Sequence, residues 1–169
     1  MIETPRLLLR PHVLGDFEAS YAISADPEVV RYIGGTPMSR EDAWARLLRF
    51  AGHWALAGHG IFAVVEKAGG TLLGEVGLAD FKRGLGAAFD GTPEGAWVFA
   101  AAAQGRGYAL EATRAAHDWY DARHGAGRRV CIIDPDNVRS LKLAAALGYR
   151  PFGGAIYKNH AVTMLERGA

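Results

Sequence analysis

The chain has 169 residues, of which 50% are hydrophobic and 22% charged, enough for one soluble domain with a sizeable core. Its 19 basic and 18 acidic residues give a net charge of +1, and the basic ones are scattered, so we expect neither nucleic acid nor a membrane surface as a partner. No apolar run reaches the ~18 residues that span a bilayer, and the N-terminus lacks the features of a signal peptide. We therefore expect one cytoplasmic domain over residues 1–169, with a single, unpaired Cys131.

The first third of the chain predicts one strand followed by helices. Residues 6–11 (RLLLRP) form a strand that proline ends. Residues 16–35 are largely helical, with a break at Asp26-Pro27. Ser39 is suited to cap a third helix, which ends near Gly58.

The remainder alternates between strands and helices. We predict a loop over 82–93, a turn at Gly69-Gly70, helices over 108–124 and 137–147, and strands over 61–67, 71–81, 95–100, 128–134, 149–154 and 160–167. The second half therefore contains a strand, a glycine turn, a helix, a strand and a helix, which is a parallel crossover unit. The other strands are expected to be antiparallel. The pattern predicts an α+β domain.

Two glycines, Gly105 and Gly107, separate the end of a strand from the start of a helix. The first amides of a helix have no partner within it, and glycines let a phosphate approach them. An anion site and an empty tight turn both fit this pattern. A dinucleotide fingerprint is excluded because Leu110 takes the place of its third glycine, and a P-loop because Gly-Lys-Ser/Thr is missing. The remaining pattern is Gln104-x-x-Gly107-x-Ala109.

A second helix start follows the next strand, in "DPDNVRSLKLAAALGY". Asn137 is a good helix cap, which by itself explains its place. In a crossover unit, however, both helix starts lie at the carboxyl ends of the strands. Two such starts beside one crevice suggest a ligand with a long, phosphate-bearing arm.

Together these motifs resemble the Gcn5-related N-acetyltransferase (GNAT) superfamily, and within it the ribosomal-protein N-acetyltransferase branch. Gln104 to Ala109 fits the acyl-CoA loop Gln/Arg-x-x-Gly-x-Gly/Ala in every position. Asn137, Ser140 and Leu147-Gly148-Tyr149 match the later signature, Asn-x-x-Ser and Leu-Gly-Phe/Tyr. The segments "ETPRLLLRP", "DPEVVRYIGG" and "GEVGL" extend the resemblance over nearly the whole chain. It implies a central mixed, mostly antiparallel sheet flanked by helices.

The resemblance also implies transfer of acetyl from acetyl-CoA to a primary amine by direct attack, without a covalent enzyme intermediate. The acceptor is a protein N-terminal α-amine or a small-molecule amine. An antibiotic or polyamine acetyltransferase and a non-catalytic acyl-CoA sensor are the alternatives. The expected assembly is a monomer or a homodimer.

The resemblance assigns residues to acetyl-CoA. Amides of the 104–109 turn would hold the pyrophosphate, with Arg106 adding charge, and an amide near Phe99 would polarise the thioester carbonyl. Lys142 would lie near the adenosine end, although a solvated lysine is an equal alternative. The implied cofactor-binding residues are Val98, Phe99, Ala100, Gln104, Gly105, Arg106, Gly107, Tyr108, Ala109, Asn137 and Lys142.

Two residues are assigned to the chemistry. Glu94, which resembles a glutamate often found at that place in relatives, is assigned as general base through water; a solvated loop carboxylate is the alternative, and Glu75 and Asp134 are reserves. Ala144 occupies the position of a tyrosine thought to protonate the departing thiolate in many relatives. Ser140 lies one turn earlier on the same face, so it is either the proton donor or only a helix cap.

The remaining reactive residues predict little further chemistry. Cys131 lies in a strand expected to be buried, where a thiol is inert. Neither HExxH nor CxxC occurs, so we expect no metal. His117 and His124 are expected to be solvated on a surface helix. His160 is only a minor candidate for the border of the acceptor pocket. Residues 100–103 are alanines where relatives often carry Pro-Glu, which changes the shape of this loop.

Overall fold

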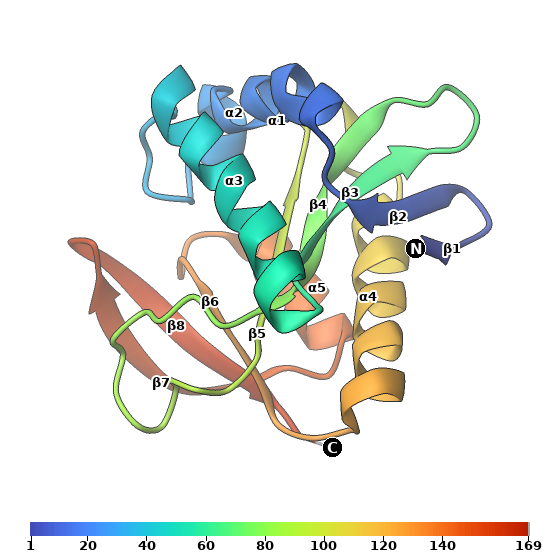
Figure 1. The fold of residues 1–169 in the computed structure, drawn as a ribbon. Coiled ribbons are helices and arrows are strands. Elements are labelled where there is room, and N and C mark those ends of the chain that lie inside the picture. Colours follow the sequence, from blue (N-terminus) through green and yellow to red (C-terminus); the bar gives the residue numbers. More distant parts are fainter. Residues whose placement is uncertain (169) are drawn as a thin grey trace.

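The computed structural model describes residues 1–168 and contains one mixed eight-stranded sheet, in the order β1-β2-β3-β4-β5-β6-β8-β7 (Figure 1). The strands are β1 (Ile2–Glu3), β2 (Leu7–Pro11), β3 (Ile61–Glu66), β4 (Leu72–Ala79), β5 (Glu94–Phe99), β6 (Arg129–Ile133), β7 (Arg150–Tyr157) and β8 (His160–Arg167). The helices are α1 (Phe17–Ser24), α2 (Pro27–Val30), α3 (Arg40–Ala57), α4 (Tyr108–His124) and α5 (Val138–Ala146), with short 3-10 turns at Leu14–Asp16 and Ala101–Ala103. None of the helices within residues 1–168 combines the length and apolar content needed to cross a bilayer.

The predicted α+β class is confirmed. All neighbouring strands pair antiparallel except β5 and β6, which are parallel and are joined through α4. Sequence analysis missed β1, whose Ile2 pairs with Leu9, because two residues are too few to produce a periodic pattern. It also placed Glu94 before the strand, whereas this residue begins β5.

The helix ends follow the local signals in the sequence. The Ser39 side chain accepts a hydrogen bond from the backbone N–H of Asp42, at 3.1 Å, and starts α3. Gly58 ends the same helix with φ of 70°, a left-handed conformation that favours glycine. The Asp26 side chain caps α2 by accepting from the N–H of Glu28.

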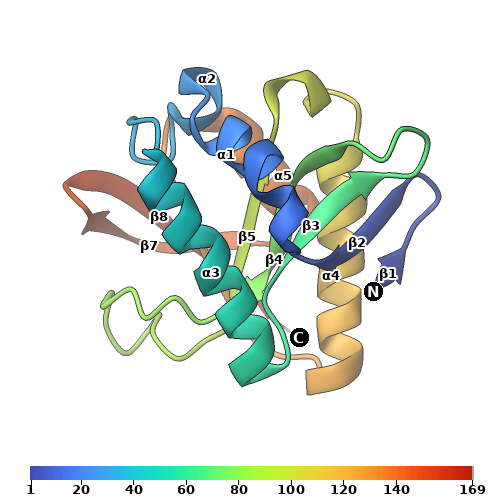
Figure 2. The same cartoon turned by 45° about the horizontal axis from the view of Figure 1, so that its top comes forward.

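The helices cover the sheet from both sides. Helices α1, α2 and α3 gather on one side of β3 and β4, while α4 runs along the other (Figures 1 and 2). Since side chains alternate along a strand, Phe62, Val76 and Phe99 pack into the core that includes α4. Glu75 points to the opposite face, where it meets α1 and α3.

The core beneath α4 contains His117, which overturns the expectation of a solvated side chain. His117 is fully buried; its Nδ1 donates to the carbonyl oxygen of Thr113, at 2.8 Å, and the Tyr149 hydroxyl donates to its Nε2, at 2.7 Å. Burial lowers its pKa to about 4, so the ring is neutral at pH 7. Ala112, Thr113 and Ala116 already mark this helix face as buried, and that stripe was the available signal. His124 is exposed, as expected.

Candidate active site

A cleft opens where β5 and β6 separate. Strand β5 pairs with β4 along its whole length, but its only ladder partner in β6 is Val130, opposite Glu94. Beyond that pair the two parallel strands diverge, and a cleft of about 330 Å³ lies between residues 95–98 and 131–134. Side chains from α3, the segment after β4 and the β7–β8 hairpin complete its walls.

One predicted residue, Phe99, has its backbone N–H on the open side of β5, where β5 and β6 separate. The N–H of Ala100 donates to the carbonyl oxygen of Leu73, at 2.9 Å, and is therefore used inside the sheet. Backbone groups alternate between the two sides of a strand, so those of Val98 also point to β4, whereas those of Phe99 point away from it. Of the three residues assigned to the pantetheine arm, Val98 and Phe99 in β5 and Ala100 just after it, Phe99 alone offers a backbone N–H on the open side. Val98 lines the cleft with its side chain.

The glycine turn presents a series of free amides. Gly105 and Gly107 adopt positive φ, of 74° and 78°. The N–H of Gln104 donates to Ala101, and that of Glu111 to Gly107. Among the described residues, the six N–H groups between them, of residues 105–110, have no backbone partner. Consecutive free amides at a helix start form a site for an anion such as a phosphate.

Arginines surround the turn. Arg106 is 58% exposed, with its guanidinium 4.0 Å from the Glu66 carboxylate and 4.9 Å from the centre of the Tyr108 ring. Arg6 donates to the carbonyl oxygen of Arg106, at 2.9 Å, and lies beside Gly107. Arg139 of α5 donates to the Gln104 side chain, whose Nε2 in turn donates to the Phe99 carbonyl, at 3.4 Å. Sequence analysis missed Arg6 and Arg139, because they lie 100 and 35 residues from the partners they contact.

The start of α5 shows which residue caps this helix, Asn137 or Ser140. The Asn137 side chain caps the helix, accepting from the N–H of Ser140, at 3.1 Å. The Ser140 hydroxyl makes no capping bond; it accepts a hydrogen bond from Trp97 Nε1, at 3.2 Å, and lines the cleft. Lys142 is exposed and lies outside the cleft lining.

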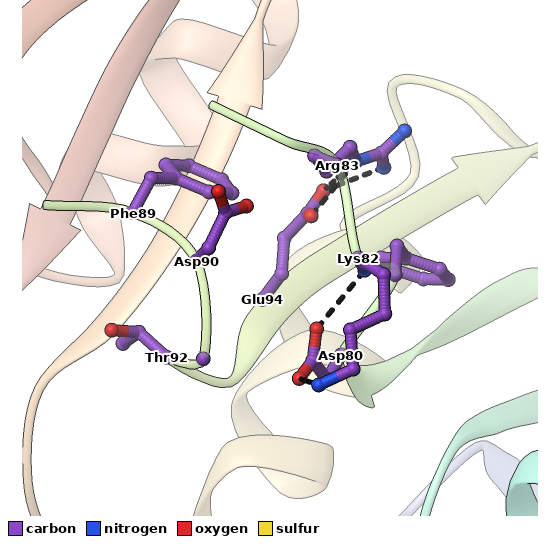
Figure 3. A pocket seen from close by; sticks show the side chains of 9 residues that line it. Asp80, Lys82, Arg83, Phe89, Asp90, Thr92 and Glu94 are labelled. Carbon is purple, nitrogen blue, oxygen red and sulfur yellow. Dashed lines mark hydrogen bonds and ion pairs between the residues drawn. The ribbon is translucent and has the colours of Figure 1, made fainter. Parts of the chain in front are cut away.

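Glu94 is a buried, ion-paired carboxylate, not a solvated loop residue. It is 3% exposed and bound by Arg83 through two bonds, Nη2–Oε1 at 2.6 Å and Nε–Oε2 at 2.9 Å (Figure 3). Burial raises the pKa of Glu94 and Arg83 opposes that rise, with burial the larger effect. The hollow behind the pair, in the loop that carries Asp90, is too narrow for a water molecule.

Glu75 is the second buried carboxylate of the cleft. It is 1% exposed, accepts from the Ser20 hydroxyl at 2.6 Å and forms an ion pair with Arg46. It lies directly opposite Val98 in the β4–β5 ladder, on the same face of the sheet. Glu94 lies four residues earlier along β5, about 14 Å away at the rise of an extended strand. Glu75 is thus the nearer carboxylate to Phe99.

The remaining candidates divide between the cleft and the core. Asp134 and His160 line the cleft. Cys131 also lies against it but is only 1% exposed, and burial raises the pKa of its thiol, which keeps it inert as expected. Ala144 is fully buried in the core beside it. Within residues 1–168 no group of three or more His, Cys, Asp or Glu side chains is placed to hold a metal ion.

Comparisons with known proteins point to one family. The acetyltransferase (GNAT) domain family matches residues 6–150. The uncharacterised N-acetyltransferase YnaD of Bacillus subtilis (strain 168) is 29% identical over 152 residues, which are 90% of this chain and 84% of that protein. A structure from Bordetella pertussis assigned to the GnaT acetyltransferase family is 33% identical, with a TM-score of 0.88 over 99% of this chain and 98% of that one.

Two more distant structures share the fold. Spermidine N-acetyltransferase from Vibrio cholerae, solved with CoA and spermine, is 17% identical, with a TM-score of 0.74 over 96% of this chain and 95% of that one. Ribosomal-protein-S5-alanine acetyltransferase from Vibrio fischeri is 19% identical, with a TM-score of 0.73 over 98% and 94%. With a family match over most of the sequence and a shared fold, the chain belongs to the GNAT family of acetyl-CoA-dependent acetyltransferases.

Proposed function

We propose that the chain acetylates a primary amine in the cleft between β5 and β6, with acetyl-CoA held at the start of α4. The observation that carries this proposal is the run of six backbone N–H groups without a backbone partner, in residues 105–110. These residues follow β5, the strand that forms one wall of the cleft. Amides that need no rearrangement can bind a pyrophosphate, and Arg6 and Arg106 add positive charge. Asn137 lies on the opposite wall, within reach of the pantetheine arm.

The backbone of β5 stabilises the negative charge that develops on the thioester oxygen during the reaction. When the amine nitrogen attacks the thioester carbon, negative charge develops on the carbonyl oxygen before the C–S bond breaks. The N–H of Phe99 points away from β4, on the side where β5 and β6 separate, and we assign it as the donor to that oxygen. Gly74 keeps β4 close to this residue: a Cβ there would lie 2.6 Å from the Phe99 ring.

A carboxylate takes the proton that the amine loses. An ammonium ion has no lone pair, so this proton must leave before or during attack. Glu94 is our first assignment, acting through water, because burial raises its pKa towards neutrality. Glu75 is the alternative on geometric grounds, since it lies opposite Val98. Asp134 lines the same cleft and is the third candidate.

Ser140 is proposed to give a proton to the departing thiolate. Its hydroxyl is engaged only as an acceptor, from Trp97, so its own proton is free to be donated. A thiol leaves readily as its anion, and the effect should be modest. We expect Ser140→Ala to lower turnover about tenfold, or ~1.4 kcal/mol of barrier, with little change in melting temperature.

Ser39→Ala is the matched control for that variant, because Ser39 is a true helix cap. Its loss should cost about 1 kcal/mol of stability and leave turnover per folded molecule intact. Turnover and melting temperature are measured for both variants. Normal turnover in Ser140→Ala would remove Ser140 from the mechanism.

The identity of the acceptor amine distinguishes the remaining proposals for the function. The sequence resemblance favours the ribosomal-protein branch, and therefore a protein N-terminus, with small amines as the second class. We expect free CoA to appear, by thiol detection, only when acetyl-CoA and an amine are both present. Binding of acetyl-CoA without any amine-dependent release of thiol, over a panel of peptides, polyamines and aminoglycosides, would instead identify an acyl-CoA sensor.

A further inference from the structure

The α3 end of the cleft holds more positive than negative charge. Its charged side chains are those of Arg46, Arg49, Glu75, Arg83, Glu94 and Lys158. Both of its carboxylates already have arginine partners: Glu75 pairs with Arg46, and Glu94 with Arg83. The charges of Arg49 and Lys158 remain. Among the described residues no carboxylate forms an ion pair with Arg49 or Lys158, so the α3 end has two basic side chains without an acidic partner.

Arg49 is the uncompensated charge best placed to bind a ligand. None of the carboxylates within residues 1–168 pairs with it. Its guanidinium lies 5.9 Å from the centre of the Phe81 ring and 6.0 Å from that of Phe50, so two apolar rings border it. Partial burial, with the nearby charges of Arg46 and Arg83, lowers its pKa. A guanidinium in such surroundings gains more from an anion than one surrounded by water.

The neighbouring aromatic rings hold this arrangement in place. Arg83 stacks on Phe81 at 4.8 Å and on Tyr157 at 4.9 Å, so Phe81 lies between Arg49 and the Arg83–Glu94 pair. Lys158 lies 5.7 Å from the centre of the Tyr157 ring, on the hairpin turn between β7 and β8. Arg49 comes from α3, Arg83 from the loop after β4 and Lys158 from the hairpin. The positive charges thus converge on one end of the cleft from three elements.

We propose that the acceptor is an amine that also carries a carboxylate, and that Arg49 binds this carboxylate. The proposal rests on the proposed function, because it takes the cleft as the acceptor site. A carboxylate accepts two parallel hydrogen bonds from a guanidinium, which orients the molecule as well as holding it. A polyamine has only positive charges and meets repulsion at the same place.

Matched acceptors test the charge requirement directly. Each acceptor with a carboxylate is compared with its amide, which has nearly the same size and no charge. The three pairs are β-alanine and β-alanine amide, 4-aminobutanoate and 4-aminobutanamide, and the peptide amides Ser-Glu and Ser-Gln. Putrescine is the cationic acceptor. The peptide pair distinguishes an acidic N-terminus from a free amino acid. In the wild type we expect kcat/KM to favour the carboxylate of at least one pair by about tenfold or more, as a charge-assisted bidentate bond requires.

Variants of Arg49 then assign the preference to one side chain. Arg49→Met should reduce it to less than about twofold, and Arg49→Lys, which keeps the charge without the planar fork, should retain part of it. Arg49 as a whole residue is exposed on α3, so both variants should fold, which their melting curves check. Arg114→Met on the exposed face of α4 is the control and should leave the preference unchanged.

The outcomes separate the two proposals. Turnover of amides or putrescine as fast as the carboxylates, or a full preference in Arg49→Met, would overturn the carboxylate site and leave the acetyltransferase reaction standing. If no amine releases CoA, the proposed function fails, and titration calorimetry of the CoA complex with the same pairs decides the binding claim. Absence of carboxylate-dependent binding there also overturns it.

Discussion

Glu94→Gln should lower kcat/KM about 100-fold, the loss expected when a general base is removed, while the affinity for acetyl-CoA stays unchanged. Glutamine keeps the shape of the side chain and one acceptor oxygen for Arg83, but it cannot take a proton at neutral pH. Steady-state kinetics with an active amine and calorimetric titration with acetyl-CoA measure the two quantities. Rates are expressed per folded molecule, because breaking a buried ion pair also costs stability.

The pH dependence gives a second readout for this variant. A general base works in its ionised form, so activity falls as the pH drops through its pKa. Burial raises the pKa of Glu94, which moves this acidic limb to a higher pH than an exposed glutamate would give. The limb should vanish in Glu94→Gln.

Two further variants decide what a different result means. Glu166→Gln breaks another arginine–glutamate pair, with Arg128 at 2.6 Å, outside the cleft lining, and should have normal kinetics. Glu75→Gln tests the carboxylate opposite Val98. A near-normal rate in Glu94→Gln together with a large loss in Glu75→Gln would transfer the role of base to Glu75.

Gly107→Glu should abolish the stabilisation that acetyl-CoA gives the wild type. At a ligand concentration 100 times Kd, binding to the native state contributes about 2.7 kcal/mol. For a domain of this size that is about 5–10 °C in melting temperature. The substitution places a carboxylate at the free amides and beside Arg6, where it competes with the pyrophosphate and repels it.

Backbone strain must be separated from charge in this variant, because Gly107 has φ of 78°. Gly125→Glu is the matched control: it places the same residue at φ of 80°, at the opposite end of α4. Both variants should melt below the wild type, but only Gly107→Glu should lose the shift on adding acetyl-CoA. A shift of wild-type size in Gly107→Glu would place the cofactor elsewhere.

The local elements of this protein could be predicted from its sequence. Helix caps such as Ser39 and left-handed glycines such as Gly58 act over three or four residues, so their signals are contiguous in the chain. The turn at Gly105 and Gly107 belongs to the same class, because its amides are freed by the start of the helix itself. The strand, turn and helix order likewise predicted the parallel crossover, since a strand followed by a helix returns to the sheet in one direction.

Only the tertiary structure decided which side chains meet. The buried His117 accepts a hydrogen bond from Tyr149, 32 residues later, and no pattern within α4 specifies that contact. Glu94 is an ion-paired core residue because the 82–93 loop brings Arg83 back over it. Arg49 pairs with no carboxylate because Arg46, one turn earlier, and Arg83 hold Glu75 and Glu94, the two at its end of the cleft. Burial and charge balance depend on every element that surrounds a side chain, and the sequence near a residue specifies only its own element.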